Sequence, residues 1–126
     1  TALQYFVDLI ERMAGRAVDL GLEVIICIQD RAELEQALAL GAAIIGINNR
    51  DILSLETDNG TVRRTANLMT SMPDEVLVLS ESSMLSAEDV KQAVSAGIDG
   101  VLIGTAFAKA ADRVALAREF HKALKK

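Results

Sequence analysis

Three short apolar runs in this chain each lead directly into polar residues, and this repeated arrangement constrains the fold more than any other feature. The runs cover residues 44–47, 76–79 and 101–103, and the residues after them are Asn48-Asn49-Arg50-Asp51, Ser80-Glu81-Ser82-Ser83 and Gly104-Thr105. Such runs are too short for helices and are typical of strands buried on both faces. In parallel α/β proteins, ligands bind at the carboxyl ends of the strands. The sequence therefore predicts a site at that edge of a parallel sheet.

Helical patterns alternate with these strands. We expect strands at residues 24–28, 44–48, 76–79 and 100–103, and helices at 3–20, 30–41, 60–69, 86–97 and 110–125. Asp30 with Glu33, and Ser86 with Asp89, have the three-residue spacing of helix N-terminal capping pairs. The repeated unit of helix, Gly turn and strand predicts a parallel sheet with right-handed crossovers. Two architectures satisfy this pattern, an open doubly wound sheet and half of an eight-stranded (β/α) barrel.

Composition limits the possible functions of the chain. At 126 residues and 51% hydrophobic, it fits a single globular domain. The net charge of -5 argues against a nucleic-acid partner, and no apolar run approaches the roughly 20 residues of a membrane span. No Gly-x-Gly-x-x-Gly turn follows any strand, and no His or Cys pair has ligand spacing, so we expect neither a dinucleotide cofactor nor a metal.

The only cysteine, Cys27, is compatible with a reducing cytoplasm, where we expect the protein to be. It lies in an apolar strand without a nearby His or Lys, so we expect a packed core residue rather than a nucleophile. The chain begins at Thr1 inside a helical pattern, without a signal peptide, and we expect it to be a part of a longer protein.

The strand-end residues resemble those of the indole-3-glycerol phosphate synthase family. The matching segments are Gly46-Ile47-Asn48-Asn49-Arg50-Asp51, Ser80-Glu81-Ser82 and Gly100-Val101-Leu102-Ile103-Gly104-Thr105. In order and spacing they resemble the ends of barrel strands six, seven and eight, and the resemblance extends from residue 3 to residue 120. It implies an α/β fold that is the C-terminal half of a (β/α)8 TIM barrel. Residues 1–126 would then form a single half-barrel domain with a parallel four-stranded sheet, strands five to eight.

The resemblance also implies a function. The family is a carbon-carbon lyase of tryptophan biosynthesis, which closes the indole ring of 1-(2-carboxyphenylamino)-1-deoxyribulose 5-phosphate with loss of carbon dioxide and water. The implied catalytic residues are Asn48, Glu81 and Ser82. The implied substrate-binding residues are Arg50, near the substrate carboxylate and ring, and Ser83, Gly104 and Thr105, which hold the phosphate. The expected partner is therefore a small phosphorylated substrate, without a cofactor.

Plainer interpretations of these residues stay open. Glu81 could be a solvated loop carboxylate, and Asn48 and Asn49 could only support a turn by bonding to backbone. The chain also departs from the family, which usually has Glu at the position of Cys27 and Gly at the position of Ser83. These departures favour a non-catalytic phosphate-binding half-barrel, a flavodoxin-like sheet or an engineered barrel fragment. The family's catalytic lysine and strand-one glutamate would lie outside this chain, so we expect it to be inactive or nearly so alone.

A half-barrel has consequences for assembly. Its two outer strands have unpaired backbone groups, and the inner face of its sheet is bare. We therefore expect a homo-oligomer, most simply a two-fold dimer. The alternative is an open monomer in which the first and last helices cover opposite faces of the sheet.

Overall fold

The computed structural model describes residues 2–50 and 61–125, which alternate between helix and strand. The strands are β1 (Ile25–Ile28), β2 (Ile44–Asn48), β3 (Leu77–Glu81) and β4 (Gly100–Leu102). The helices are α1 (Ala2–Asp19), α2 (Arg31–Ala39), α3 (Arg63–Met69), α4 (Ala87–Ser95), α5 (Thr105–Lys109) and α6 (Arg113–Leu124). No helix within these residues is long and apolar enough to cross a membrane.

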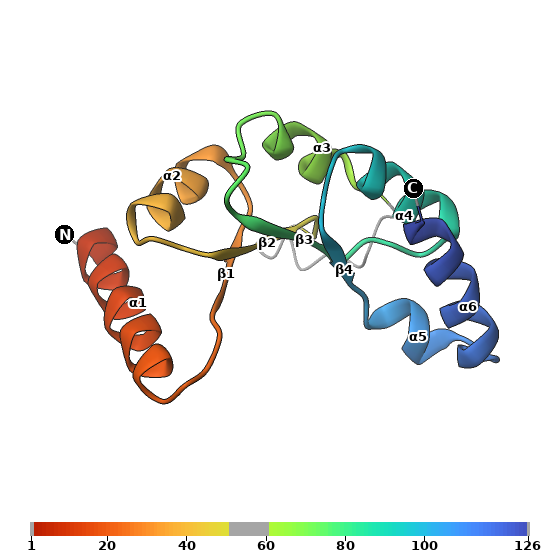
Figure 1. Ribbon diagram of the computed structural model, residues 1–126, viewed down its shortest axis with the longest axis horizontal. Coiled ribbons are helices and arrows are strands. Elements are labelled where there is room, and N and C mark those ends of the chain that lie inside the picture. The colour runs from red at the N-terminus through yellow and green to blue at the C-terminus, as the bar shows by residue number, and fades with distance from the viewer. Residues whose placement is uncertain (1, 51–60, 126) are drawn as a thin grey trace.

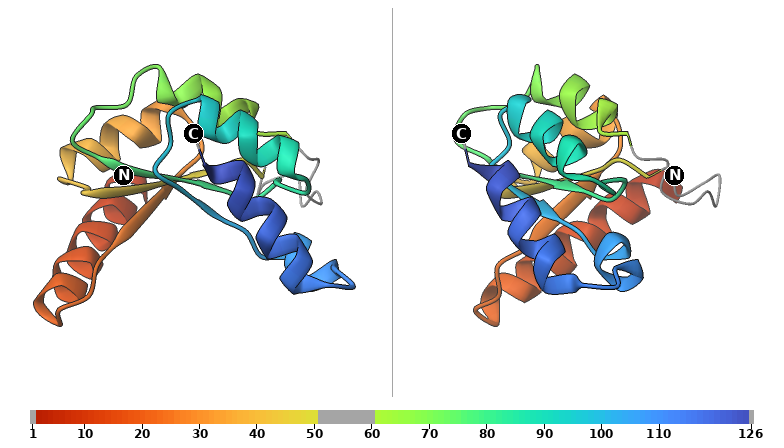
Figure 2. Two further views of the ribbon diagram at one scale, coloured as in Figure 1. Left: turned by 45° about the vertical axis from the view of Figure 1, so that its right-hand side comes forward. Right: turned by 90° about the vertical axis from the view of Figure 1, so that its right-hand side faces the viewer.

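The four strands form one parallel sheet in the order β1-β2-β3-β4, as the repeated unit predicts. Helices α2, α3 and α4 lie over one face of this sheet, and α1 and α6 lie at its two ends (Figures 1 and 2). The result is an arch with its helices on the outside. This arrangement is that of a half-barrel rather than a doubly wound sheet, in which helices cover both faces.

The hydrophobic core lies between the sheet and the outer helices. It contains side chains from β2 and β3, including Ile45, Ile47 and Val78, which pack with Val90 of α4 and Phe120 of α6. Each of these five side chains is at most 3% exposed. This layer therefore fixes the positions of the strands, and with them the positions of the strand ends.

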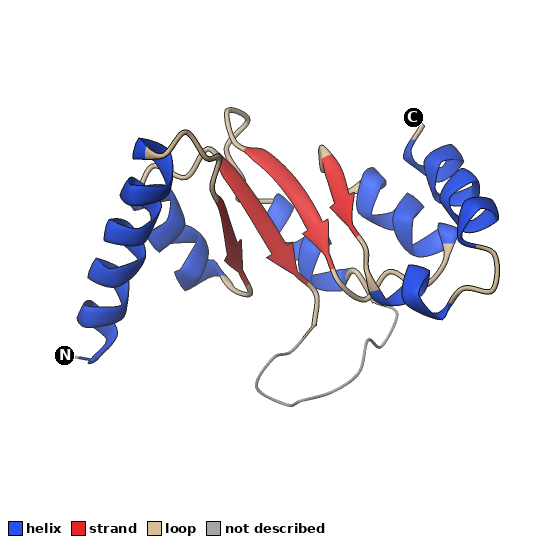
Figure 3. Ribbon diagram, turned by 90° about the horizontal axis from the view of Figure 1, so that it is seen from below, coloured by secondary structure: helices blue, strands red, loops and turns tan. Residues whose placement is uncertain are grey.

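The opposite face of the sheet is uncovered by the described residues (Figure 3). Ile25, Leu77 and Leu102 are 42%, 54% and 55% exposed, although each belongs to a strand. The prediction that the strands are buried on both faces is wrong for this structure, because the described helices cover only the outer face. We call the uncovered side the open face. The strand residues on this face are Ile25, Cys27, Ile44, Gly46, Asn48, Leu77, Leu79, Glu81, Gly100 and Leu102.

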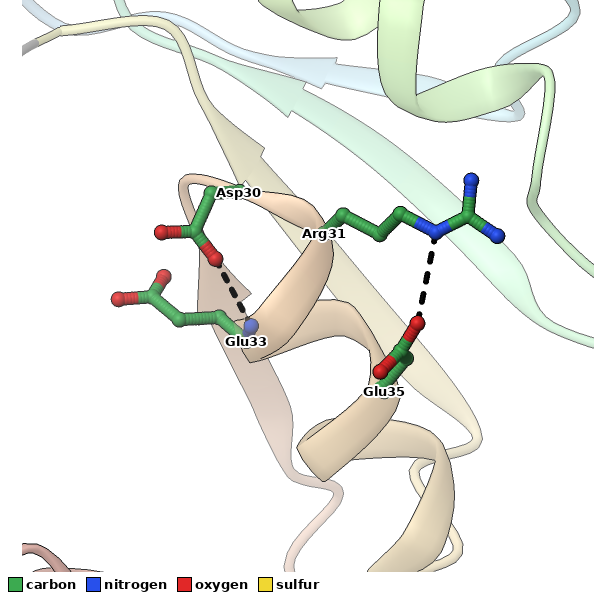
Figure 4. Close-up of polar contacts among 4 residues, drawn as sticks. All are labelled: Asp30, Arg31, Glu33 and Glu35. Carbon is green, nitrogen blue, oxygen red and sulfur yellow. Dashed lines mark hydrogen bonds and ion pairs between the residues drawn. The ribbon is translucent and has the colours of Figure 1, made fainter.

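Both predicted helix caps are present. The Asp30 carboxylate accepts a hydrogen bond from the backbone N–H of Glu33 at 2.9 Å (Figure 4). The Glu33 carboxylate accepts one from the backbone N–H of Gln29. The same helix contains the ion pair of Arg31 and Glu35, 3.4 Å apart, but both side chains are more than two-thirds exposed, so it contributes little stability (Figure 4). Ser86 and Asp89 form a reciprocal capping box at the start of α4.

Several element boundaries differ from those expected. Strand β3 continues to Glu81, because Ser80 and Glu81 still pair with β2. The short helix α5 follows β4 where we expected a loop, and α6 begins only after the capping residue Asp112. Helix α3 begins at Arg63 rather than near residue 60. The predicted features at Asp51 and in the loop at 54–58 lie outside the described residues.

Candidate active site

The carboxyl ends of β2, β3 and β4 meet around one pocket of about 310 Å³. Its lining residues are Arg50, Glu81, Ser82, Ser83, Met84, Leu102, Ile103, Gly104 and Thr105. Six of the seven predicted site residues are therefore in this lining, and they come from segments far apart in the sequence. The seventh, Asn48, is the residue of β2 that pairs with Glu81 in the sheet.

Glu81 is the last residue of β3 and is only 8% exposed, so it is not a solvated loop carboxylate. Its side chain crosses the open face of the sheet above Gly46 of the neighbouring strand, where a Cβ would come within 2.7 Å of the carboxylate carbon. Oε1 accepts a hydrogen bond from the thiol of Cys27 in β1, 3.4 Å away. The carboxylate thus lies at the boundary between the pocket and the open face.

Cys27 is exposed, so the prediction of a packed core residue is wrong. Its strand position places it on the open face, which the described helices do not cover. The pKa of the thiol is raised to about 11, first by burial of part of the side chain and then by the charge of Glu81 and their hydrogen bond. Cys27 is therefore protonated at neutral pH, which agrees with the expectation that it is not a nucleophile.

Asn49 is the centre of a buried hydrogen-bond network beneath the pocket. Its side-chain Nδ2 donates to Ser80 Oγ at 2.9 Å and to the backbone carbonyls of Glu81 and Ser82 at 2.9 and 3.3 Å. Its Oδ1 accepts from the backbone N and the Oγ1 of Thr65 in α3, at 3.2 and 3.0 Å. This residue was considered only as a turn support, and it does bond to backbone. The bonds join α3 to the end of β3, however, and no local spacing reveals that.

Ser82 and Ser83 follow Glu81 with left-handed backbone angles, φ 62° and 58°. Residues with a Cβ seldom adopt this conformation unless the surrounding structure holds them in it. Here the Asn49 side chain donates hydrogen bonds to the backbone carbonyls of Glu81 and Ser82, which fixes the chain on both sides of the Ser82 Cα. The Ser83 side chain is 1% exposed, and its Oγ has no hydrogen-bond partner among residues 2–50 and 61–125. A serine therefore occupies the left-handed position at which glycine was expected to be needed.

Two arginines lie near the strand ends. Arg50 Nη2 donates to Thr105 Oγ1 at 3.3 Å, which joins the loop after β2 to the start of α5 across the pocket. The backbone N of Arg50 donates to Asn48 Oδ1 at 3.0 Å. Arg64, which the sequence analysis did not single out, donates to the carbonyls of Asn48 and Arg50 at 2.8 and 3.0 Å. The described part of the pocket lining thus has one guanidinium and one carboxylate, so the pocket can hold an anion and a reacting proton.

The chain resembles known proteins along most of its length. The family model described as indole-3-glycerol phosphate synthase matches residues 5–120. The indole-3-glycerol phosphate synthase of Acetivibrio thermocellus is 42% identical over 101 residues, covering 80% of this chain and 38% of that protein. The one from Burkholderia vietnamiensis is 37% identical over 113 residues, covering 89% and 42%. The chain therefore spans less than half of the length of these relatives.

Solved structures share the fold. The Amycolatopsis orientalis BexX/CysO complex has a TM-score of 0.70 at 20% identity, over 90% of this chain and 46% of that one. The native KDPGal structure has a TM-score of 0.68 at 21% identity and is covered over 53% of its length. At these identities the similarity concerns the fold alone, and here too the chain corresponds to part of a larger unit.

Proposed function

The chain belongs to the indole-3-glycerol phosphate synthase family, and from that premise we propose that its pocket takes part in indole-ring closure. The substrate would be 1-(2-carboxyphenylamino)-1-deoxyribulose 5-phosphate, which loses carbon dioxide and water. The observation that supports this proposal is the convergence of six predicted residues on one pocket that contains both Arg50 and Glu81.

One side of the pocket suits a phosphate group. Ser83, Gly104 and Thr105 lie there. Arg50, which the resemblance places near the substrate carboxylate and ring, donates to Thr105 and so also supplies positive charge to this side. A Cβ on Gly104 would meet no atom within 4 Å, so the space beside this residue is open to an anion. We therefore assign the substrate phosphate to this side.

The other side of the pocket has the reacting carboxylate. Glu81 exchanges a proton in this proposal, with Asn48 and Ser82 orienting the substrate beside it. Among the described residues of the pocket lining Glu81 is the one carboxylate, and a ring closure needs both a general acid and a general base. The chain alone therefore has little or no turnover, and a second proton-transfer group comes from outside it.

Binding of the product tests the phosphate assignment without requiring turnover. We expect indole-3-glycerol phosphate to shift the backbone amide signals of Ser83, Gly104 and Thr105 in a two-dimensional NMR titration. Gly104→Val fills the open space and weakens binding at least tenfold, whereas Gly15→Ala, in α1 with no atom within 4 Å, leaves it unchanged. Product binding without shifts at these residues would move the phosphate site elsewhere.

Turnover tests the enzyme assignment. Indole fluorescence should stay at background with the chain alone and rise when the unmatched portion of the Acetivibrio thermocellus relative is supplied. Glu81→Gln should abolish that rise. A fully active chain, or an unaffected Glu81→Gln variant, would contradict the roles proposed above.

A non-catalytic phosphate-binding half-barrel is the second candidate, and the exposed, protonated Cys27 favours it, because the family has a carboxylate at that position. The two candidates differ in what they recognise. A phosphate-binding module would bind inorganic phosphate and the product with similar affinity, whereas the enzyme site gains affinity from the indole.

We also propose that two copies of the chain assemble through their open faces, and that the protein is cytoplasmic. The outer strands β1 and β4 each have one unpaired edge in the sheet. In a two-fold pair of arches, β4 of one copy would lie parallel to β1 of the other, which closes both edges at once.

A further inference from the structure

Three neighbouring strands bring Cys27, Gly46 and Glu81 together on the open face. Cys27 of β1 pairs directly with Gly46 of β2, and Glu81 of β3 reaches over that glycine. The hydrogen bond from Cys27 Sγ to Glu81 Oε1, 3.4 Å long, joins two strands that are not neighbours in the sheet. This contact spans 54 positions in the sequence.

Gly46 is what makes the contact possible. Strands in a sheet are about 4.8 Å apart, so the backbones of β1 and β3 are separated by roughly 9.6 Å. A glutamate side chain can reach across the intervening strand only where that strand has no side chain in the way. A Cβ at Gly46 would come within 2.7 Å of the carboxylate carbon of Glu81. The Glu81 side chain therefore occupies the space that a side chain at position 46 would fill.

We propose that Cys27 is a positioning residue for Glu81: its thiol donates the hydrogen bond that holds the carboxylate over Gly46 at the mouth of the pocket. This inference deepens the proposed function and rests on it in one respect: the role of Glu81 as the reacting carboxylate belongs to that proposal. The contact itself exists whatever the reaction is.

The protonation state of the thiol agrees with this role. Its pKa is raised to about 11, first by burial and then by the charge of Glu81 and the hydrogen bond, so at neutral pH the thiol is a donor. Glu81 is the only charged side chain within the four strands, whose other open-face neighbours are apolar except for Asn48. The guanidinium of Arg50 lies in the pocket lining together with Glu81. Cys27 therefore holds Glu81 without adding a second negative charge.

The position of the carboxylate is the first measurement. In the 126-residue chain, nuclear Overhauser effects between the Glu81 side chain and the Gly46 Hα atoms report that the carboxylate lies over the glycine. We expect Cys27→Ala to abolish them and Cys27→Ser, which keeps a donor at the same place, to restore them. Ile25→Ala is the matched control, because it removes an apolar open-face side chain two residues earlier in β1 and should change nothing.

The reactivity of the thiol is the second measurement. We expect iodoacetamide to alkylate Cys27 slowly at pH 8 to 9 and the rate to rise towards pH 11. Glu81→Gln should lower the pKa of the thiol and so move this pH profile to lower pH. At a fixed pH below the pKa, the alkylation rate should rise about tenfold for each unit by which the pKa falls. A purely structural cysteine would not respond in this way.

The outcomes separate this inference from the proposed function. An unchanged pH profile in Glu81→Gln, or Overhauser effects that survive in Cys27→Ala, would overturn the positioning role. If both measurements come out as expected while the product does not bind, the positioning role stands and the proposed function fails.

Discussion

The carboxylate of Glu81 lies directly over Gly46, in a space that any side chain on the neighbouring strand would occupy. A buried carboxylate therefore depends on a glycine that is not its neighbour in sequence. Glycine is required here for close approach and not for its backbone freedom, because its φ is not in the left-handed region. The reacting group and the strand beside it are thus matched in shape.

Replacement of Gly46 by Ala should displace Glu81 without unfolding the chain. The added methyl group meets mainly the end of a flexible side chain, so we expect the free energy of unfolding to change by less than about 1 kcal/mol. Alkylation of Cys27 should become faster, because the carboxylate moves away from the thiol. In a Glu81→Gln background the same substitution should have no further effect on alkylation. A large loss of stability would show that Glu81 cannot move.

Replacement of Ser83 by Gly should stabilise the protein. The substitution relieves two costs to the folded state. One is the left-handed conformation of a residue with a Cβ, about 1 kcal/mol or more, and the other is a buried hydroxyl without a partner among the described residues, about 1–3 kcal/mol. The added freedom of glycine in the unfolded chain offsets roughly 0.5–1 kcal/mol. We expect a net gain in the free energy of unfolding of at least about 1 kcal/mol, measured by urea unfolding.

Ser82→Gly is the matched control for that prediction, because Ser82 has the same left-handed φ. It lacks the buried, unpaired hydroxyl among the described atoms, so its gain should be smaller. If Ser83→Gly lowers stability, the serine hydroxyl has a stabilising partner.

Asn49 should be the most sensitive residue beneath the pocket. Asn49→Ala removes the side-chain partner of the buried Thr65 backbone N–H and of the Ser82 carbonyl, whereas the Ser80 and Thr65 hydroxyls still pair with each other at 2.7 Å. We expect a loss of about 3 kcal/mol in the free energy of unfolding. Asn49→Asp keeps an acceptor for Thr65 but cannot donate to Ser80, so it should also destabilise. Asn67→Ala, at an exposed position in α3, should change stability by less than about 0.5 kcal/mol.

Much of this arrangement could be predicted from the sequence. The strand at residues 44–48 is where the apolar run predicts it, and the half-barrel architecture is confirmed by the parallel sheet and by the family match. The grouping of Glu81 with Gly104 and Thr105 followed from the rule that strand ends meet at one edge. The roles of these residues stay predictions.

Other features could not be predicted, for physical reasons. Both faces of each strand are apolar, so periodicity cannot show that the open face is uncovered. The contact of Cys27 with Glu81 and the network of Asn49 join residues 16 to 54 positions apart, and local spacing does not report such contacts. Helix α5 has only five residues, too few for a periodic signal.

The stability of the chain should fall at high pH because of Cys27. Its pKa in the folded protein is raised from 9.0 to about 11, so the unfolded chain releases the thiol proton first as pH rises. Stability is therefore unaffected by this group below pH 9 and declines between pH 9 and 11. Urea unfolding at pH 8 and pH 10.5 should show a smaller loss for Cys27→Ala than for the wild type. Equal losses would mean that the thiol titrates alike in both states.

The last prediction concerns the open face. Leu77 and Leu102 are more than half exposed on this face, and contact of so much apolar surface with water is unfavourable. A second copy whose open face packs against the first would bury this surface on both copies, which favours the dimer over two monomers. Sedimentation equilibrium over a concentration series should therefore show a dimer. Leu102→Glu places a charge in that interface and should shift the equilibrium to monomer. Val114→Glu, at a 61% exposed position on α6 outside the open face, should leave the dimer intact. A wild-type chain that stays monomeric at every concentration would contradict the paired arches and leave the open face to a different partner, such as the portion of the relatives that this chain does not match.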